Sequence, residues 1–588
     1  MGKKRTTKKS HVKDASEGVS QLRALENDLL RVLTDEEQWG SGDERMNAAL
    51  KETFQLLDAL DRLRMRIEIR NDGTHVNTRA SALGNFWEKA DGAEESRRLA
   101  RLHAFLDEPC MSGSCDAWEM RETNALDGKG RGVYAKRDLL KYEVAFQIPR
   151  SIMFSAMHGR AIEMRSSGNT GAVWDEHINS VLATMEDNTV VSLAMVLLHH
   201  TANGSASFFW PYINSLPREY DIPAFWPIEF FSAVEDVKTA RKAKLNVRAT
   251  AMLYMRCAKA VQAYAERMKK CGEEDTSSPW LYPGVGLLWK HFRWAMATVT
   301  TRQNQIPIGE FVSPPEKQQQ ALTLVPGWDM MNHRKGEMTT DFDTGNESIV
   351  FRTMEATRKG EEILMCYGTR RSDELLIYSG FVDETNKGDD LLLLDLSIPC
   401  AEGLAKMRKG IYKALTNVQL MDHIDTIEIA LKMPASASMT AFASVATSIS
   451  ASVIGSAKGC DDGWHDCIST VLPTPSLSAL IAVSINKDEV AMILRLSDKR
   501  PEHIYGLLCE ASKRRLYHAL RRSLESSLAK NEPQKQSIKI DTQSPPEPAL
   551  LVSASHHSRW IPLARSCALL NEAHAAIKTA FNHVLDAL

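Results

Sequence analysis

The sequence predicts an α+β protein in which short strands are split by a long helical insertion and followed by a mostly helical region. Residues 127–154 and 320–382 combine glycines with alternating apolar residues, a pattern typical of short strands. Residues 155–300 lie between them and repeat apolar residues at the i, i+3 and i+4 spacing of helices. Helical periodicity returns beyond about residue 390.

The expected elements divide the chain into four parts. The helical start is predicted from VSQLRALENDLLRVL and ALKETFQLLDALDRL, whose apolar residues fall on one helix face. The parts are a disordered basic tail (1–18), an N-terminal helical region (19–115), a strand-rich domain (116–385) with its helical insertion at about 155–300, and a helical C-terminal substrate-binding domain (386–588) that contains a low-complexity loop (433–457) and a polar linker (529–549).

Composition sets the broad class of protein. The chain has 588 residues, of which 43% are hydrophobic and 25% are charged, so it can bury a large core. The net charge of −3 produces no general attraction to nucleic acid or to a membrane surface. We therefore expect no membrane and no specific nucleic acid as partner, and a cytoplasmic protein. The basic start MGKKRTTKKSHVK also resembles a weak nuclear-localisation signal.

Neither a membrane span nor a cysteine metal site is well supported by the sequence. Residues 433–457 carry no charge but contain few large apolar side chains, so we expect a loop and not a membrane span. The ten cysteines include no CxxC pair, so we expect no metal site and buried free thiols in a reducing compartment.

Four segments carry the functional signal: GKGRGVYA (128–135), TRQNQIP (301–307), WDMMNH (328–333) and YGTRRSDELLIYSGF (367–381). In this order they resemble SET-domain methyltransferases of the Rubisco-large-subunit-methyltransferase-like class. Within that class TRQNQIP, PGWDMMNH and FFWPYINSLPREYDIP are similar to the branch that methylates a histidine of actin. The resemblance implies a SET domain, S-adenosylmethionine as cofactor and actin as the bound protein substrate.

The resemblance also assigns residues to the cofactor. It implies that the side chains or backbone of the following residues contact S-adenosylmethionine: Lys129, Gly130, Arg131, Gly132, Arg302, Asp329, Met330, Met331, Asn332, His333, Ser379, Gly380 and Phe381. Glycine permits close backbone approach, and the fork of donors on Arg302 suits a carboxylate. Arg97 or Arg98 is a further candidate. The family's acidic-Gly-aromatic-Gly turn is Lys-Gly-Arg-Gly here, so any aromatic stacking from position 131 is lost.

The catalytic residues implied by the resemblance are Tyr367, which would line the methyl-transfer channel, and Asn304. Histidine, with a pKa near 6.5, is largely neutral at pH 7, so its difficulty is the choice of tautomer. An amide oxygen on Asn304 could accept the N–H of the ring and fix that tautomer. Gln303, Asn304, Trp328 and Arg370 are the expected contacts to the substrate.

Simpler interpretations remain open for the same residues. Tyr367 or Trp328 can be a core aromatic residue, Asn304 can cap a turn before Pro307, and Glu361–Glu362 can be a solvated acidic pair. Two other functions also remain: lysine methylation of another protein by the same fold, and a catalytically silent SET module that binds a protein partner.

Overall fold

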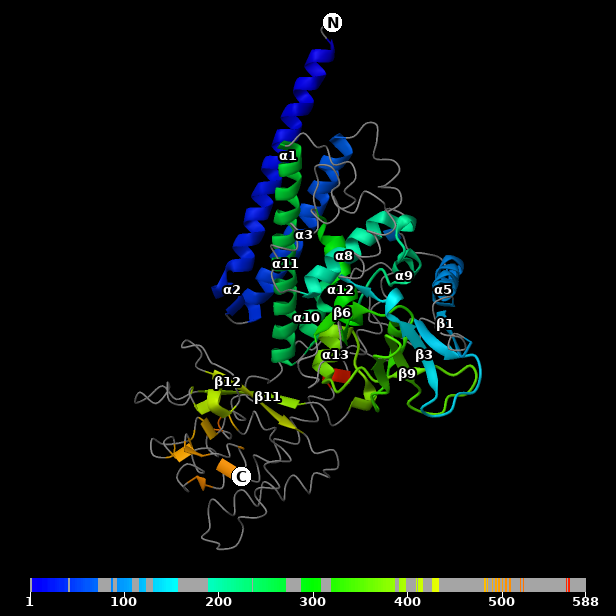
Figure 1. Ribbon diagram of the computed structural model, residues 1–588. Helices are drawn as coiled ribbons and strands as arrows, with labels where there is room; N and C mark the ends of the chain where they lie inside the picture. The colour runs from blue at the N-terminus through cyan, green and yellow to red at the C-terminus, as the bar shows by residue number, and fades with distance from the viewer. Residues whose placement is uncertain are drawn as a thin grey trace, which may run out of the picture.

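The computed structural model shows an α+β protein, as the sequence predicts (Figure 1). The structure describes residues 3–40, 43–71, 86–87, 92–107, 116–122, 131–156, 189–234, 236–270, 287–307, 319–386, 391–397, 409, 411–415 and 426–432, and separate positions from 478 to 571. The predicted loop 433–457 and linker 529–549 lie outside these residues.

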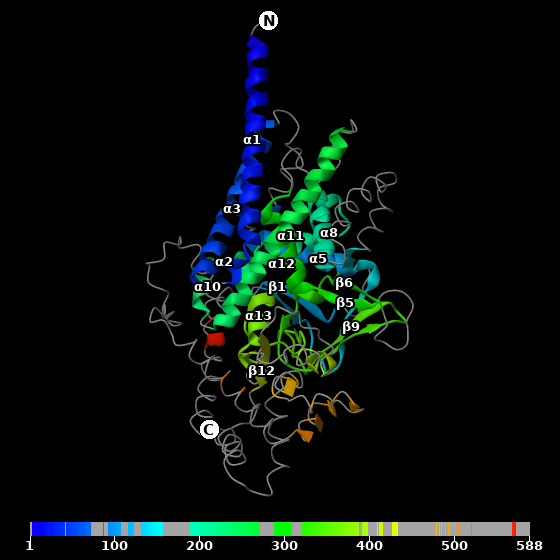
Figure 2. The same cartoon turned by 90° about the vertical axis from the view of Figure 1, so that its left-hand side faces the viewer.

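A layer of long helices forms one side of the molecule (Figures 1 and 2). Helix α1 (Lys3–Thr34) packs against α3 (Asp43–Asn71) and α11 (Val237–Lys270), and α2 (Glu36–Gly40) joins the first two. Helix α1 begins at Lys3, within the stretch 1–18 that the sequence predicts as a basic tail. Lysine and arginine are good helix formers, so a basic segment can extend a helix that is held by packing further along.

The strands form small sheets beside this layer. Their bounds are β1 (Trp118–Glu122), β2 (Arg131–Ala135), β3 (Val144–Pro149), β4 (Phe154–Ser155), β5 (Asn304–Pro307), β6 (Gln320–Leu324), β7 (Asn332–His333), β8 (Thr340–Asp343), β9 (Ser348–Arg352) and β10 (Leu364–Met365). The orders are β1-β2, β3-β9-β8 and β4-β6-β5, with antiparallel pairing throughout. Strands β7 and β10 pair in parallel, with Asn332 opposite Leu364 and His333 opposite Met365.

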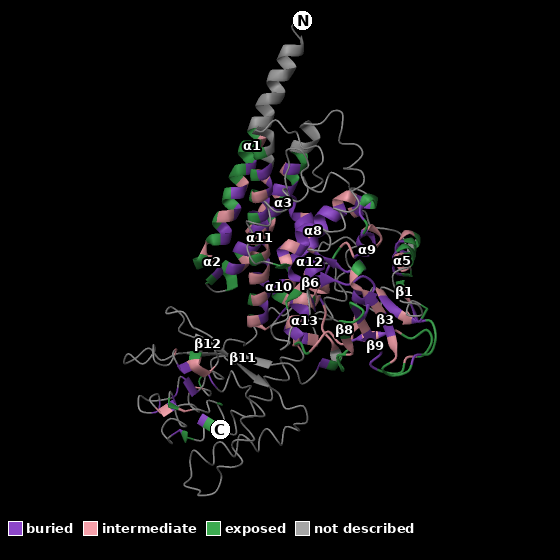
Figure 3. Ribbon diagram, in the orientation of Figure 1, coloured by how far each residue is buried: buried purple, intermediate pink, exposed green. Residues whose placement is uncertain are grey.

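Helices inserted between β4 and β5 supply much of the core (Figure 3). They are α8 (Thr189–Asn203), α9 (Trp210–Ser215), α10 (Phe230–Ala233), α11 and α12 (Trp289–Arg302), with 3₁₀ turns at η4 (Gly204–Ala206) and η5 (Pro223–Phe225). Helix α8 is apolar on nearly all sides and packs against α12 and β6. Helix α5 (Gly92–Asp107) precedes the strands and packs against α9 and β1. The remaining 3₁₀ turns are η2 (Arg150–Ile152), η7 (Trp328–Met330) and η8 (Glu384–Asn386).

The region after α13 (Ser372–Ser379) begins with strands, which differs from the predicted helical domain. Strand β11 (Leu391–Ser397) pairs antiparallel with β12 (Thr426–Lys432) over seven residue pairs. The periodicity predicts a mostly helical region beyond about residue 390, but the short leucine run at 391–394 is equally compatible with a strand. Further on, Leu570 joins the main core and Asn571 donates a hydrogen bond to the carbonyl of Ala233 at 2.9 Å.

The described residues also bear on the expected lack of a membrane span and on the cysteines. No helix among them is long and apolar enough to cross a membrane. Of the cysteines in the described segments, Cys257 and Cys567 are buried free thiols and Cys366 is a half-buried one.

A buried ion pair joins α1, α3 and α11. Arg64 on α3 donates to Glu26 on α1 at 2.6 Å, to the carbonyl of Leu287 at 2.6 Å and to the hydroxyl of Tyr254 on α11. The side chains of Arg64 and Glu26 are only 3% and 10% exposed, so neither charge is well solvated. Each charge therefore depends on the other for its stability in the fold.

We expect Glu26→Gln to lower the free energy of unfolding by about 3 kcal/mol, because it leaves the Arg64 charge buried without its counterion. Urea denaturation measures the change. Asp58→Asn is the matched control, since Asp58 pairs with Arg62 on the same helix layer while both side chains are more than 60% exposed. That variant should lose less than about 1 kcal/mol. Equal losses would contradict the interpretation.

Candidate functional site

The parallel pairing of β7 with β10 brings WDMMNH and YG together. Tyr367 lies two residues beyond β10, and its backbone N–H donates to Nδ1 of His333 at 3.1 Å. The hydroxyl of Tyr367 donates to the carbonyl of Met331 at 2.7 Å. The ring of Phe381, just after α13, lies 5.9 Å from the His333 ring and 6.2 Å from the Tyr367 ring. The structure thus holds the backbone and the hydroxyl of Tyr367 in fixed positions.

The protonation of these two rings follows from their surroundings. Burial lowers the pKa of His333, although Asp383 lies 3.6 Å from Nε2 and opposes the shift. Since Nδ1 accepts a hydrogen bond from Tyr367, the proton of the neutral ring belongs on Nε2. Burial raises the pKa of Tyr367 to about 12, so its hydroxyl stays protonated at neutral pH and acts as a donor.

A buried ion pair lies beneath the tyrosine. Arg302, at the end of α12, donates from Nη1 to the carbonyl of Asp329 at 2.6 Å and lies 3.7 Å from its carboxylate. Tyr212 on α9 donates to Oδ2 of the same carboxylate at 2.5 Å. Burial raises the pKa of Asp329 to about 6, against the opposing effects of Arg302 and of the hydrogen bond from Tyr212. Asp329 is therefore mostly ionised at pH 7.

Several buried polar atoms here have no hydrogen-bond partner among the described residues. They are Nε of Arg302, Oδ1 of Asp329 and Oε1 of Gln303. Burying a donor or an acceptor without a partner costs about 1–3 kcal/mol, so such atoms require an explanation, of which a bound ligand or an ordered water is one. One donor and two acceptors fit a zwitterionic amino-acid group, which presents both a carboxylate and an ammonium. This donor set agrees with the implied cofactor.

Asn332 is fixed by both hydrogens of its amide. Nδ2 donates to the backbone carbonyl of Arg131 at 2.7 Å and to Oε1 of Glu362 at 2.7 Å. What remains of this side chain for a ligand is its oxygen. A Cβ at position 132 would lie 2.6 Å from Oε1 of Glu362, so that carboxylate would have to move away from Asn332.

The TRQNQIP segment spans the change from helix to strand. Helix α12 ends at Arg302, Gln303 caps it, and Asn304 begins β5 opposite Thr323 of β6. Asn304 is half-buried, whereas the next residue, Gln305, is exposed on the other side of the strand. Within the described part of the chain, the Asn304 side chain has no hydrogen bond that would make it a simple turn cap.

The other predicted site residues are divided between the core and the surface. Trp328 is 8% exposed, and its Nε1 lies 3.3 Å from the hydroxyl of Thr340, so most of its ring belongs to the core. Arg370 is exposed and donates to the carbonyl of Tyr367 at 3.3 Å. Met330 and Met331 are buried. The structure does not describe Lys129 and Gly130.

The turn after α13 is shaped by close backbone packing. Gly380 has a φ of 83° and caps the helix that ends at Ser379, and a Cβ on it would lie 3.0 Å from the backbone of Asp221. This turn directs Phe381 toward His333 and Tyr367, as described above. Ser379 is half-buried beside it.

Sequence reasoning did not identify three residues that shape this site: Tyr212, Glu362 and Asp383. Tyr212 belongs to FFWPYINSLPREYDIP, which contributes to the family resemblance, but the resemblance assigned no role to this residue. Glu362 was expected in a solvated acidic pair, but it is half-buried and bonded to Asn332, so that expectation is wrong for this residue. In the described segments no group of three or more histidine, cysteine, aspartate or glutamate side chains is arranged to hold a metal ion.

Comparison with known proteins identifies the class. Residues 130–368 match the family model for the SET domain. This range contains β2 through β10, together with Tyr367, Asn332 and the inserted helices. These residues therefore form a SET domain, which confirms the resemblance carried by the four sequence segments.

Two relatives of known name are similar to about half of this chain. The chain is similar to the actin-histidine N-methyltransferase of Drosophila melanogaster, at 27% identity over 330 residues that cover 55% of this chain and 57% of that protein. It is also similar to the actin-histidine N-methyltransferase of Danio rerio, at 28% identity over 295 residues that cover 50% of this chain and 44% of that protein. The chain thus spans about half the length of the curated relatives it matches.

A solved structure of Rubisco LSMT bound to sinefungin and monomethyllysine aligns with 84% of this chain and 93% of its own. The sequence identity is 15% and the TM-score is 0.49.

We expect Gly132→Ala to lower the free energy of unfolding by about 1–3 kcal/mol, because the new Cβ displaces the Glu362 carboxylate from Asn332. Chemical denaturation checks this. The control is Gly40→Ala, at a position where a Cβ would meet nothing within 4 Å. A loss at position 132 no larger than that at position 40 would show that Glu362 does not depend on the glycine.

Proposed function

We propose that this protein is an S-adenosylmethionine-dependent protein-histidine N-methyltransferase and that its substrate is a histidine of actin. The observation that carries the proposal is the set of unpartnered buried atoms on Arg302, Gln303 and Asp329 beneath the fixed Tyr367. The SET domain and the names of the relatives support methyl transfer as the reaction.

Arg302 and Asp329 would hold the amino-acid part of the cofactor. Nε of Arg302 is a donor for its carboxylate, and Oδ1 of Asp329 is an acceptor for its ammonium. The oxygen of Asn332 adds an acceptor on the β7 side, since both hydrogens of that amide are already donated. The fit requires Asp329 in its ionised form.

S-adenosylmethionine supplies a methyl group activated by its sulfonium. The residues of this chain must then align the acceptor nitrogen and exclude water. Tyr367 lines this region with a hydroxyl that keeps its proton and is already bonded to the Met331 carbonyl. It is therefore suited to shape the channel and unsuited to act as a base at neutral pH.

Asn304 favours histidine over lysine as the acceptor. A histidine ring is largely neutral at pH 7, whereas a lysine arrives protonated and must first lose a proton. The Asn304 amide oxygen can accept the N–H of the ring and leave the other nitrogen bare. Gln303 and Arg370 would be further contacts to the substrate chain. We further propose that the protein acts in the cytoplasm and that its C-terminal region binds actin.

The direct test is methyl transfer from labelled S-adenosylmethionine to purified actin, with mass spectrometry locating the methyl group. One methylated histidine on actin is the expected result. Methylation of lysine instead, or of other proteins in a lysate, would support the alternative of a lysine methyltransferase. No transfer to any protein would support a silent SET module.

Asn304→Ala should reduce turnover on the protein substrate by about 10- to 100-fold, because the acceptor ring loses the group that orients it. Cofactor affinity, measured by calorimetry, should change little. Gln305→Ala is the matched control, since Gln305 is the next residue on β5 and is exposed. Equal losses of turnover and cofactor affinity in Asn304→Ala would mean that the residue is only structural.

Cofactor affinity should depend on the ionisation of Asp329. The pKa of about 6 means that Asp329 takes up a proton as the pH falls below 6, and it then loses its attraction for the ammonium. The dissociation constant should be constant between pH 7 and 8 and should rise by up to about tenfold per pH unit below 6. Calorimetry with S-adenosylhomocysteine measures this.

Asp329→Asn should bind weakly at neutral pH and lose the pH dependence. The exposed Asp341→Asn should keep the profile of the unchanged protein. If the dissociation constant of Asp329→Asn still rose as the pH dropped below 6, the pH dependence would belong to another group.

A further inference from the structure

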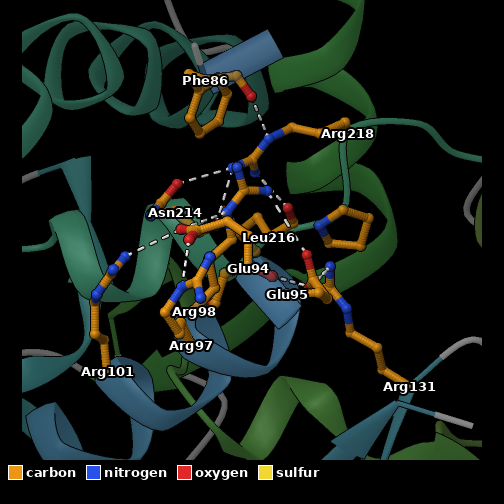
Figure 4. Close-up of polar contacts among 12 residues, drawn as sticks. Phe86, Glu94, Glu95, Arg97, Arg98, Arg101, Arg131, Asn214, Leu216 and Arg218 are labelled. Carbon is orange, nitrogen blue, oxygen red and sulfur yellow. Dashed lines mark hydrogen bonds and ion pairs between the residues drawn. The ribbon is translucent and has the colours of Figure 1, made fainter. Parts of the chain in front are cut away.

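The side chain of Arg131 links the SET domain to an element outside it (Figure 4). Its guanidinium forms an ion pair with Glu95 on α5 and donates to the backbone carbonyl of Ser215 at the end of α9. Glu95 is only 5% exposed. Helix α5 covers residues 92–107 and therefore lies outside the matched SET range of 130–368.

Glu95 lies among an excess of positive charge. Arg98 approaches it at 3.6 Å and is 7% exposed, and Arg218 lies close to both Arg98 and Arg131. Burial and the charges of Arg98 and Arg131 lower the pKa of Arg218 to about 9, and Glu95 opposes this shift. Removal of the Glu95 charge would therefore take the buried carboxylate away from the buried Arg98 and from the half-buried Arg131 and Arg218.

Arg218 fixes the turn that receives Arg131. It donates to the carbonyl of Phe86 at 2.6 Å and to the carbonyl and side-chain oxygen of Asn214 at 2.9 and 3.0 Å. Its guanidinium also stacks over the Phe86 ring at 3.6 Å. These contacts hold the backbone from 214 to 216, and with it the Ser215 carbonyl, in one position.

Arg131 is connected to the proposed cofactor site by two contacts, one through β2 and one through α9. The carbonyl of Arg131 receives the hydrogen bond from Asn332, so a shift of β2 moves Asn332. Arg131 also donates to the carbonyl of Ser215 at the end of α9. The same helix carries Tyr212, which donates to Asp329. Both Asn332 and Asp329 therefore depend on the place of Arg131.

We propose that Arg131 and Glu95 are positioning residues for the cofactor site, which they set by locking β2 and α9 against α5. This inference rests on the proposed function. It gives Arg131 a different role from the direct cofactor contact expected for a residue of the glycine turn, because its guanidinium is already engaged by Glu95 and Ser215.

The test compares Arg131→Met, Arg131→Lys and Glu95→Gln with the control Arg101→Met. Arg101 lies on the same helix and pairs with Glu94 at 3.3 Å, but its side chain is 54% exposed. Three quantities are measured for each full-length variant: the dissociation constant for S-adenosylhomocysteine, the KM for the protein substrate, and hydrogen exchange of the peptides that contain residues 131–135 and 328–333 without ligand.

Arg131→Met and Glu95→Gln should raise the dissociation constant by about 10- to 100-fold, leave the KM for the protein substrate unchanged and speed exchange in both peptides. Arg131→Lys keeps the charge but can donate to fewer acceptors. Its dissociation constant and exchange rates should therefore lie between those of the other two variants and those of the unchanged protein. Arg101→Met should behave like the unchanged protein. Equal affinity and exchange in all variants would overturn the inference.

The exchange measurement separates this inference from the proposed function, because it needs no cofactor. If the unchanged protein bound no S-adenosylhomocysteine but Arg131→Met still loosened residues 328–333, the proposed cofactor would be wrong and the positioning would stand. If Arg131→Met fails to fold, the isosteric Glu95→Gln and the conservative Arg131→Lys carry the test.

Discussion

The buried pair of Arg302 and Asp329 is the constraint on which the rest of the site depends. Arg302 comes from the inserted helices and Asp329 from the turn before β7, so the pair ties two distant stretches of the chain at one point. A buried ion pair is costly unless its remaining atoms also find partners. Here Nε of Arg302 and Oδ1 of Asp329 find none among the described residues. The pair therefore stabilises the fold incompletely and leaves specific binding capacity for a zwitterionic ligand.

Tyr367, Asn332 and His333 are arranged around this pair by backbone geometry. The short parallel pairing of β7 and β10 sets the two segments side by side, and His333 serves as the acceptor that holds the backbone of Tyr367. Arg131 of β2, whose carbonyl accepts a hydrogen bond from Asn332 of β7, forms an ion pair with Glu95 of α5. A helix that precedes the SET domain in sequence thus contributes to the stiffness of the site.

The sequence was most informative where local chemistry decides structure. The α+β class could be predicted from periodicity, and the SET domain was implied by the resemblance that the four short segments carry. The roles of Gly132 and Glu362 could not, because a single carboxylate from a distant loop determines both. Tyr212 and Glu95 were also missed, since a tyrosine in an aromatic segment and a glutamate on an amphipathic helix look ordinary until tertiary packing buries them. The strands β11 and β12 were missed because a short leucine run fits helix and strand alike.

The most direct test of this account is a crystal structure of the protein with S-adenosylhomocysteine. The account predicts that the ligand's carboxylate lies within hydrogen-bond distance of Nε of Arg302 and that its ammonium lies equally close to Oδ1 of Asp329. Asn332 should keep its bonds to Arg131 and Glu362 and present its oxygen to the ligand. A ligand bound elsewhere, with Arg302 and Asp329 contacting only each other, would contradict the central claim that this buried pair is the cofactor site.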